Sequence, residues 1–322
     1  MLPVAIVEPL QQAENPMRFA MQTIAEGAQS GQKIWKEGDS FIVDFGVHMT
    51  GYLSFQIVPT GSVADSPVRL RLTFGEVPTD VAEPLYPYSA WISAAWLPEE
   101  IITIDDLPQL YRVARRHAFR YVKFEVIAAS RRFGVRFEDM TGIAVTSAKS
   151  EPTLLPENYP EWIRRVDMVS QNTLRDCMQT CFEDGPRRDR RLWVGDLRLQ
   201  ALANYVTFGE DSVVKRCLYL FAGLPRSDGL VNGCVYERPV PTYADTTTLD
   251  YAALFCVTLQ EYVDATGDIA TGLDLWPVAM RQMEVILTKV NDADLFIDNG
   301  DTWCFIDWAF GLAQSEAQHH CC

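Results

Sequence analysis

The sequence predicts a multidomain chain, an antiparallel β-sandwich followed by an all-α domain, and three observations support this fold class. The chain has 322 residues, enough for two domains of the usual length of about 100–200 residues. Apolar and polar residues alternate in segments between Phe41 and Phe137, as in strands with one buried face. After Pro152 and Pro156 the apolar residues recur at the spacing of a helix, which indicates a domain boundary near residue 150.

The first 38 residues are a lead-in of mixed pattern, in which Met17–Ala28 is compatible with a helix. The predicted sandwich domain follows over residues 39–150. Its clearest strand patterns occupy four segments, namely 53–57, 68–74, 122–126 and 133–137. Short alternating strands that are separated by turn-rich segments favour an antiparallel sandwich.

Residues 151–310 form the predicted helical domain. Apolar residues recur at helical spacing in five segments, namely 162–181, 197–208, 211–222, 247–265 and 274–290. Successive helices without strands between them predict an all-α arrangement. The last segment, 311–322, has no amphipathic period and holds two of the four histidines. We interpret it as an atypical tail, of the kind that a truncation or a frame shift just after Trp308 would leave.

Composition and charge limit the classes of function. Lys and Arg total 28 and Asp and Glu total 43, and the resulting net charge of −15 disfavours a nucleic-acid partner. An uncharged carbohydrate would feel no such repulsion. No apolar stretch reaches about 18 residues and no basic region precedes an apolar run at the N-terminus, so we expect neither a membrane anchor nor a signal peptide.

The sequence offers little material for metal or cofactor chemistry. Four histidines are few for a histidine-centred metal site or a Ser-His-Asp triad. The eight cysteines lack paired Cys-x-x-Cys spacing, and we expect buried, reduced thiols of the kind that suits the cytoplasm. We therefore predict no cofactor and no metal, and carboxylate chemistry becomes the default.

The segment Cys181–Asp196 gathers three aspartates, four arginines and a tryptophan in a turn between two helical patterns. The pair Gly185–Pro186 ends the preceding helix near Phe182. Loops held between rigid helices often carry binding and catalytic groups, so we predict a sugar site here. The alternative, a solvated helix connection with surface ion pairs, is compatible with the same charge content.

The order of residues in this segment resembles the central motif of the bacterial alpha-L-rhamnosidases and their six-hairpin relatives. The matching positions are Asp184, Pro186, Arg188, Asp189, Trp193, Gly195 and Asp196. Segments on either side look like the β-sandwich and the later helices of that family, so the resemblance covers roughly residues 40–309. These segments are Val43–Gly46, Gly51–Leu53, Leu72–Glu76, Phe119–Val122, Glu261–Asp268, Leu275–Pro277 and Phe305–Trp308.

The resemblance implies that the helical domain is an (α/α)6 toroid, here incomplete. A complete toroid has six helical hairpins, more than the predicted helices can form. The resemblance therefore implies a chain truncated within its catalytic domain. Apolar helix faces that the missing hairpins leave uncovered would promote self-association.

Glycosidic hydrolysis usually needs two carboxyl groups, one protonated to assist the leaving oxygen and one ionised. We assign the acid role to Asp189. Trp193 can supply an apolar wall that raises a carboxyl pKa, while the neighbouring arginines would lower it. The resemblance places the general base, a glutamate, in the later half of the toroid, beyond the end of this chain.

The resemblance also implies that Asp184 and Asp196 face the pocket, where they accept hydrogen bonds from sugar hydroxyls. For Asp196 a helix cap is an equal alternative. We add Arg188 to the substrate-binding residues and expect Arg187 and Arg188 to orient the aspartates by bidentate pairing.

Two tryptophans, Trp193 and Trp308, are expected to stack on a pyranose face, although a place in the core is the commoner outcome for any single tryptophan. Weaker pocket candidates are Glu237, Asp245 and Asp250. Together these residues predict a carbohydrate-binding surface rather than a site for a charged polymer.

We therefore expect a glycoside hydrolase of alpha-L-rhamnosidase type, which cleaves terminal α-L-rhamnosyl or related bonds by carboxylate acid/base catalysis with inversion. The alternative is a non-catalytic or vestigial carbohydrate-binding fragment that lacks the general-base half. A helical glycosidase with another sugar preference is the third reading, because a fold does not choose a substrate.

Overall fold

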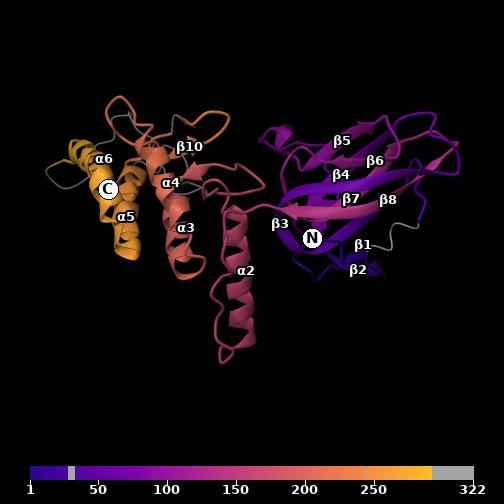
Figure 1. Cartoon of the computed structure of the whole chain (residues 1–322), viewed down its shortest axis with the longest axis horizontal. Helices are drawn as coiled ribbons and strands as arrows, with labels where there is room; N and C mark the ends of the chain where they lie inside the picture. Colours follow the sequence, from indigo (N-terminus) through magenta and orange to yellow (C-terminus); the bar gives the residue numbers. More distant parts are fainter. Residues whose placement is uncertain (28–32, 245, 292–322) are drawn as a thin grey trace. The chain divides into compact units, whose positions relative to one another are not determined.

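The computed structural model describes residues 1–27, 33–244 and 246–291, and the chain divides into two compact units (Figure 1). The first unit contains Met1–Val145 together with the three residues Pro186–Arg188. The second contains Thr146–Gly185 and the described residues from Asp189 onward. The first unit is a sandwich-like antiparallel sheet domain and the second is mainly helical.

Within the described residues the sheet of the first unit has eight strands, all paired antiparallel. The strands are β1 (Ala5–Gln11), β2 (Phe19–Glu26), β3 (Ser40–Thr60), β4 (Val68–Gly75), β5 (Glu99–Ile104), β6 (Gln109–Arg112), β7 (His117–Ala128) and β8 (Gly134–Ala144). Their order is β2-β1-β3-β7-β4-β5, and β6 and β8 also pair with β3. A short helix α1 (Pro78–Ala82) and a 3₁₀ turn η2 (Ala94–Trp96) lie between β4 and β5.

The long strand β3 makes the sheet sandwich-like, because its two halves pair with different partners. Its first half pairs with β1 and β7, and its second half pairs with β6 and β8. The register of its pairing with β7 shifts between Asp44 and Met49, and Gly46 there adopts a φ of 79°, which glycine tolerates best. Phe41 and Phe55, from the two halves, nevertheless belong to one buried core.

The four strand patterns expected from the sequence are confirmed, since they fall in β3, β4, β7 and β8. The helix expected over Met17–Ala28 is wrong. Strand β2 occupies most of that segment and pairs with β1, which in turn pairs with β3. Because β2 exposes much of both faces, its sequence alternates weakly, and pairing with a neighbouring strand decides its structure.

Five helices in the described part of the second unit confirm the five helical patterns. They are α2 (Glu161–Cys177), α3 (Val194–Val206), α4 (Asp211–Ala222), α5 (Leu249–Thr266) and α6 (Ile269–Leu287). A three-stranded sheet that the sequence did not indicate lies among them. Its strands are β9 (Leu192–Trp193), β10 (Cys234–Tyr236) and β11 (Thr242–Tyr243). No helix in these described segments is long and apolar enough to cross a membrane.

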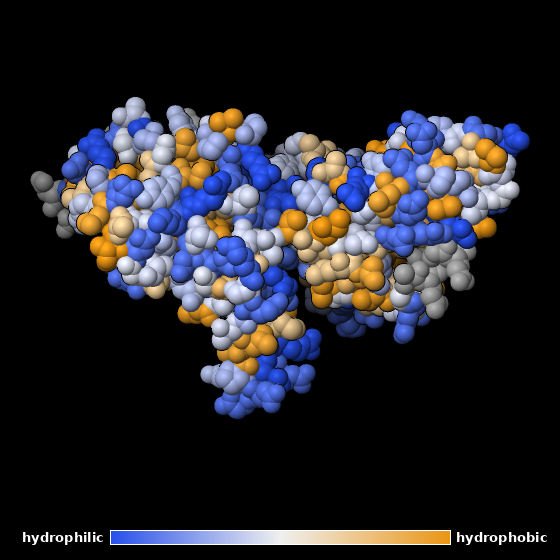
Figure 2. Space-filling model, in the orientation of Figure 1, coloured by the Kyte–Doolittle hydropathy of each residue, from blue (hydrophilic) through white to orange (hydrophobic). Residues whose placement is uncertain are grey.

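Helix α2 buries its C-terminal end and exposes much of its apolar stripe (Figure 2). Leu174 and Cys177 are buried, whereas Trp162 is 69% exposed and Val166 is 59% exposed. Helices α5 and α6 likewise form an open apolar groove of about 340 Å³. Trp276 and Met280 line this groove, and both are partly exposed to solvent. The helical unit therefore presents apolar helix faces to solvent.

Candidate functional site

The loop that follows α2 closes on itself through Asp184. The backbone N–H of Asp184 donates to the Arg191 carbonyl at 2.9 Å, and the Arg191 N–H donates to Asp184 Oδ1 at 3.0 Å. Inside this closure the Arg190 N–H donates to the Gly185 carbonyl at 3.0 Å, and Arg190 adopts a left-handed φ of 62°. Phe182, completely buried, anchors the first end of the loop. Asp184 therefore holds the two ends of the loop together.

The three-stranded sheet anchors the second end of the loop. Trp193 and Leu192 in β9 pair with Cys234 and Val235 in β10. Leu192, Cys234 and Val235 are buried, so the pairing fixes Trp193 at the edge of the core of the helical unit. The Arg191 guanidinium lies over the Tyr236 ring at 4.4 Å, a cation–π contact that extends this anchor.

Helix α3 begins directly after Trp193 and brings a third aspartate to the loop. Asp196 lies in the first turn of α3, where the N-terminal end of a helix favours a negative charge. Asp196 is not the N-cap residue, since Trp193 occupies that position, but its carboxyl accepts a hydrogen bond from its own backbone N–H and so satisfies one donor of the first turn. The carboxyl of Asp196 is half-buried and remains a candidate for ligand binding.

A tyrosine from α5 packs against this helix end, and a glycine makes its approach possible. The rings of Trp193 and Tyr251 meet edge to face with centroids 6.4 Å apart. A Cβ atom on Gly195 would lie 2.7 Å from Tyr251 Oη, too close for any side chain to fit without displacing the ring. Gly195 therefore lets the Tyr251 ring reach the Asp196 end of α3.

The carboxyl groups of Asp184 and Asp196 both have a raised pKa. Burial raises the pKa of Asp184, and the charge of Asp189 raises it further, while hydrogen bonds from the backbone of Arg191 and Gly185 oppose the shift. Burial also raises the pKa of Asp196, and the charge of Asp184 adds to the effect. Asp184 is therefore close enough to both Asp189 and Asp196 for their charges to interact.

The buried thiol of Cys234 lies close enough to the same three aspartates for their charges to act on it. Burial raises its pKa to about 12, the Arg191 guanidinium opposes this, and the charges of Asp184, Asp189 and Asp196 all reinforce it. Burial and the charge of Asp196 likewise raise the pKa of Tyr251 to about 12. Thus the thiol and the phenol beside the aspartates stay protonated at neutral pH.

The structure brings together four of the residues that the sequence predicts for the site. Asp184, Asp189, Trp193 and Asp196 are all half-buried in the helical unit. Arg188 is exposed and groups with the first unit, so its part in sugar binding stays a prediction. Two further predicted residues, Asp245 and Trp308, lie outside the described residues.

One expectation about a neighbouring side chain needs correction. Arg187, which we expected to orient the aspartates of the loop, makes bidentate hydrogen bonds to Asp80 of α1. Glu237 pairs with Arg216 and Thr180, and its place in the pocket stays a prediction. Asp80 lies more than 100 residues before Arg187, so nearness in the sequence did not predict the ion pair of Arg187.

Sequence analysis missed Tyr251 and Cys234, which border the aspartates. Both reach the site only through folding, since α5 and β10 follow the loop by about 40 residues or more along the chain. Gly195 and Gly233 are the signal that could have found Tyr251, because a Cβ atom on either would contact its ring. Among the described residues, no cluster of His, Cys, Asp or Glu is suited to hold a metal ion.

Asp196→Asn should raise the unfolding midpoint of the ligand-free protein at pH 7. Because burial and Asp184 raise the pKa of Asp196 in the folded state, that carboxyl is protonated in both states below pH 3.8 and destabilises the fold once it ionises. The gain from the neutral amide should therefore grow as pH rises from 4 to 7. Urea unfolding across this pH range measures it.

The matched control is Asp264→Asn on the exposed surface of α5, which should leave the midpoint nearly unchanged at every pH. A lower midpoint for Asp196→Asn at pH 7 would show that Asp196 is stabilised by a partner and not strained by burial.

Two protein-family models match this chain, one over the sheet domain and one over the helical domain. Residues 3–144 match the model of the glycosyl hydrolase family 78 alpha-rhamnosidase N-terminal domain, and residues 160–320 match that of the bacterial alpha-L-rhamnosidase six-hairpin glycosidase domain. The chain belongs to the family 78 alpha-L-rhamnosidases. The family resemblance that the motif in Cys181–Asp196 indicated is thus confirmed for both the sheet domain and the helical domain.

Solved structures of rhamnosidases also resemble this chain. A rhamnosidase from Klebsiella oxytoca with rhamnose bound is 43% identical, with a TM-score of 0.91 over 95% of this chain and 60% of that one. A family 78 rhamnosidase of Bacillus sp. GL1 and an alpha-L-rhamnosidase from Dictyoglumus thermophilum share 21% and 16% identity with this chain, with TM-scores of 0.66 and 0.61. The matched regions cover 84% and 86% of this chain, and 26% and 30% of the Bacillus and Dictyoglumus chains. At these identities the likeness shows the fold alone.

The chain spans about 60% of the length of the Klebsiella rhamnosidase that it matches. Curated protein sequences gave no match. Family membership therefore rests on the two domain models and on the Klebsiella structure.

Proposed function

We propose that this chain binds terminal α-L-rhamnosyl groups and takes part in their hydrolysis, with Asp189 as the general acid. The convergence of Asp184, Asp189 and Asp196 beside Cys234 carries this proposal. Rhamnose bound to the 43% identical Klebsiella protein supports the choice of sugar. A neutral monosaccharide also fits a chain of net charge −15, since it is not repelled.

The environment of the aspartates suggests their division of labour. Asp184 and Asp196 are half-buried carboxyl groups of raised pKa, so hydroxyl groups of a bound sugar that donate to them would stabilise their ionised forms. Asp189 would protonate the oxygen of the leaving group. The edge-to-face pair of Trp193 and Tyr251 offers an apolar wall for a pyranose ring.

Inversion requires a second carboxylate about 6.5–9.5 Å from the acid, which activates water on the opposite face of the sugar. We assign no described residue to this role. In this proposal α2 to α6 form the first part of the toroid of six hairpins for which the family model is named.

The alternative is a sugar-binding protein without turnover. The observation that favours it is that Asp184 and Asp196 are half-buried carboxyl groups of raised pKa, which can accept sugar hydroxyls without any bond being cleaved. Binding would then use Asp184 and Asp196 in the same way, and Asp189 would have no substrate bond to cleave.

Hydrolysis and binding should be measured on the same preparation. Turnover of p-nitrophenyl α-L-rhamnoside, with the β-anomer of rhamnose formed first in the NMR spectrum, supports the inverting enzyme. Calorimetric binding of L-rhamnose without turnover supports the alternative. Glucuronate and galactose serve as comparison sugars, and failure to bind or cleave any rhamnoside would contradict both proposals.

Two further properties belong to the proposal. We propose a cytoplasmic location, because the described cysteines Cys177, Cys181, Cys217, Cys234 and Cys256 are free thiols and four of them are buried. We also propose self-association through the exposed apolar faces of the helical unit, which sedimentation over a range of protein concentrations tests.

A further inference from the structure

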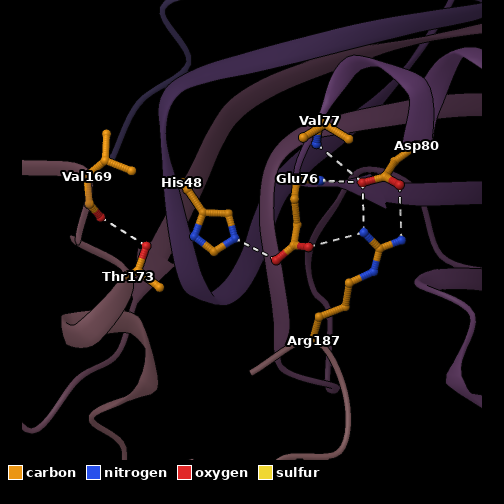
Figure 3. Close-up of polar contacts among 7 residues, drawn as sticks. All are labelled: His48, Glu76, Val77, Asp80, Val169, Thr173 and Arg187. Atoms are coloured by element: carbon orange, nitrogen blue, oxygen red, sulfur yellow. Dashed lines mark hydrogen bonds and ion pairs between the residues drawn. The ribbon is translucent and has the colours of Figure 1, made fainter. Parts of the chain in front are cut away.

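An ion cluster in the first unit surrounds the side chain of Asp80 (Figure 3). The Asp80 carboxylate accepts backbone N–H groups from Glu76 at 2.9 Å and from Val77 at 3.3 Å. Arg187 donates to both of its oxygens, with Nη1 at 2.8 Å from Oδ2 and Nη2 at 3.1 Å from Oδ1. Asp80 is thus held by the backbone before α1 and presents a fixed fork to the guanidinium.

A second carboxylate strengthens the hold on Arg187. Glu76 Oε2 accepts from Arg187 Nη1 at 3.1 Å, and Glu76 Oε1 pairs with His48 Nε2 at 2.9 Å. Burial opposes ionisation of Glu76, yet the hydrogen bonds from His48 and Arg187 lower its pKa overall. The Asp80 side chain is only 17% exposed, so this arrangement is better shielded from water than an ordinary surface ion pair.

Arg187 lies in the chain between Asp184 and Asp189, two residues of the candidate sugar site. Pro186–Arg188 group with the first unit, whereas Gly185 and Asp189 on either side group with the second. Arg187 lies three residues after Asp184 and two before Asp189. Two residues span at most about 7 Å, so fixing the backbone at Arg187 restricts the positions that Asp189 can reach.

We propose that Arg187 is a positioning residue whose pairing with Asp80 and Glu76 fixes the middle of the loop that carries Asp184 and Asp189. Arg187 thereby holds the backbone of the loop between the two aspartates. This inference rests on the proposed function for its effect on rhamnose, while its effect on the loop is independent of any ligand.

The test uses three variants of the whole chain, Asp80→Asn, Arg187→Gln and the double variant. Asparagine at position 80 still accepts the N–H groups of Glu76 and Val77, so α1 keeps its support while the ion pair is lost. Amide hydrogen exchange of residues 184–191 should rise in each variant. The Kd for L-rhamnose should rise by at least about threefold in Arg187→Gln and by less in Asp80→Asn, in which Glu76 still pairs with Arg187. The double variant should match Arg187→Gln, because that substitution already removes both ion pairs.

Arg187→Lys retains the charge without the fork and should recover part of the affinity. The matched control is Asp44→Asn, which breaks a similar bidentate pair with Arg120, at 2.9 Å for both bonds, elsewhere in the same unit. It should lower the stability of the sheet domain without changing loop exchange or rhamnose affinity.

The outcomes separate the two proposals. Unchanged exchange of residues 184–191 in Asp80→Asn and Arg187→Gln overturns the positioning role, whatever the sugar does. Faster exchange with unchanged rhamnose affinity also overturns it, because the loop would then be held without consequence for binding. If the parent chain binds no rhamnose, the proposed function falls, and exchange alone decides whether Arg187 holds the loop.

Discussion

Asp189→Asn should lower the turnover of rhamnosides by about 10²- to 10⁴-fold, while the Kd for L-rhamnose stays within about twofold. Asparagine has nearly the same shape but cannot release a proton to the leaving oxygen. The leaving group sharpens the test, because p-nitrophenolate departs with little help and an alkoxide does not. The loss should therefore be much greater for methyl α-L-rhamnoside than for the p-nitrophenyl compound, as parallel measurements of kcat would show.

The matched control for this prediction is Asp184→Asn in the same loop. Asp184 closes the loop with Arg191 and is proposed to accept sugar hydroxyls, so its amide variant should weaken rhamnose binding and affect both leaving groups alike. If Asp189→Asn cleaves the methyl rhamnoside as fast as the parent, Asp189 is not the general acid.

Elements that bury one face of their own were predictable from the sequence. The helix expected over 211–222 coincides with α4, because Val214, Leu218 and Phe221 recur on one side and are all buried. Strand β2 was not predictable, since it exposes much of both faces and depends on pairing with β1. The short strands β9 and β10 likewise hold few residues and form only when Leu192 and Val235 meet.

The candidate site was predictable to the extent that it is local. Asp184, Asp189 and Asp196 lie within 13 consecutive residues, and one closed loop with the helix after it is enough to bring them together. Tyr251 comes from α5, and the partners of Arg187 lie more than 100 residues before it. Such contacts depend on the packing of distant segments, which residue spacing does not encode.

Phe124→Ala should lower the free energy of unfolding of the sheet domain by about 3–5 kcal/mol, the usual cost of removing a buried aromatic ring. Phe124 is 1% exposed in the central strand β7. Its ring stacks on Phe41 at 4.9 Å and meets Phe137 at 5.2 Å and Phe55 at 5.3 Å. The substitution therefore removes contacts to both halves of β3 and to β8 at once.

Urea unfolding followed by a signal from the sheet domain measures this loss, and Val63→Ala is the control because Val63 is 85% exposed. The control should change the free energy of unfolding by no more than about 0.5 kcal/mol. A loss below about 1 kcal/mol for Phe124→Ala would mean that the surrounding rings collapse into the cavity. The large loss is expected instead, since Phe41, Phe55 and Phe137 are each fixed by their own strand pairing and cannot move inward together.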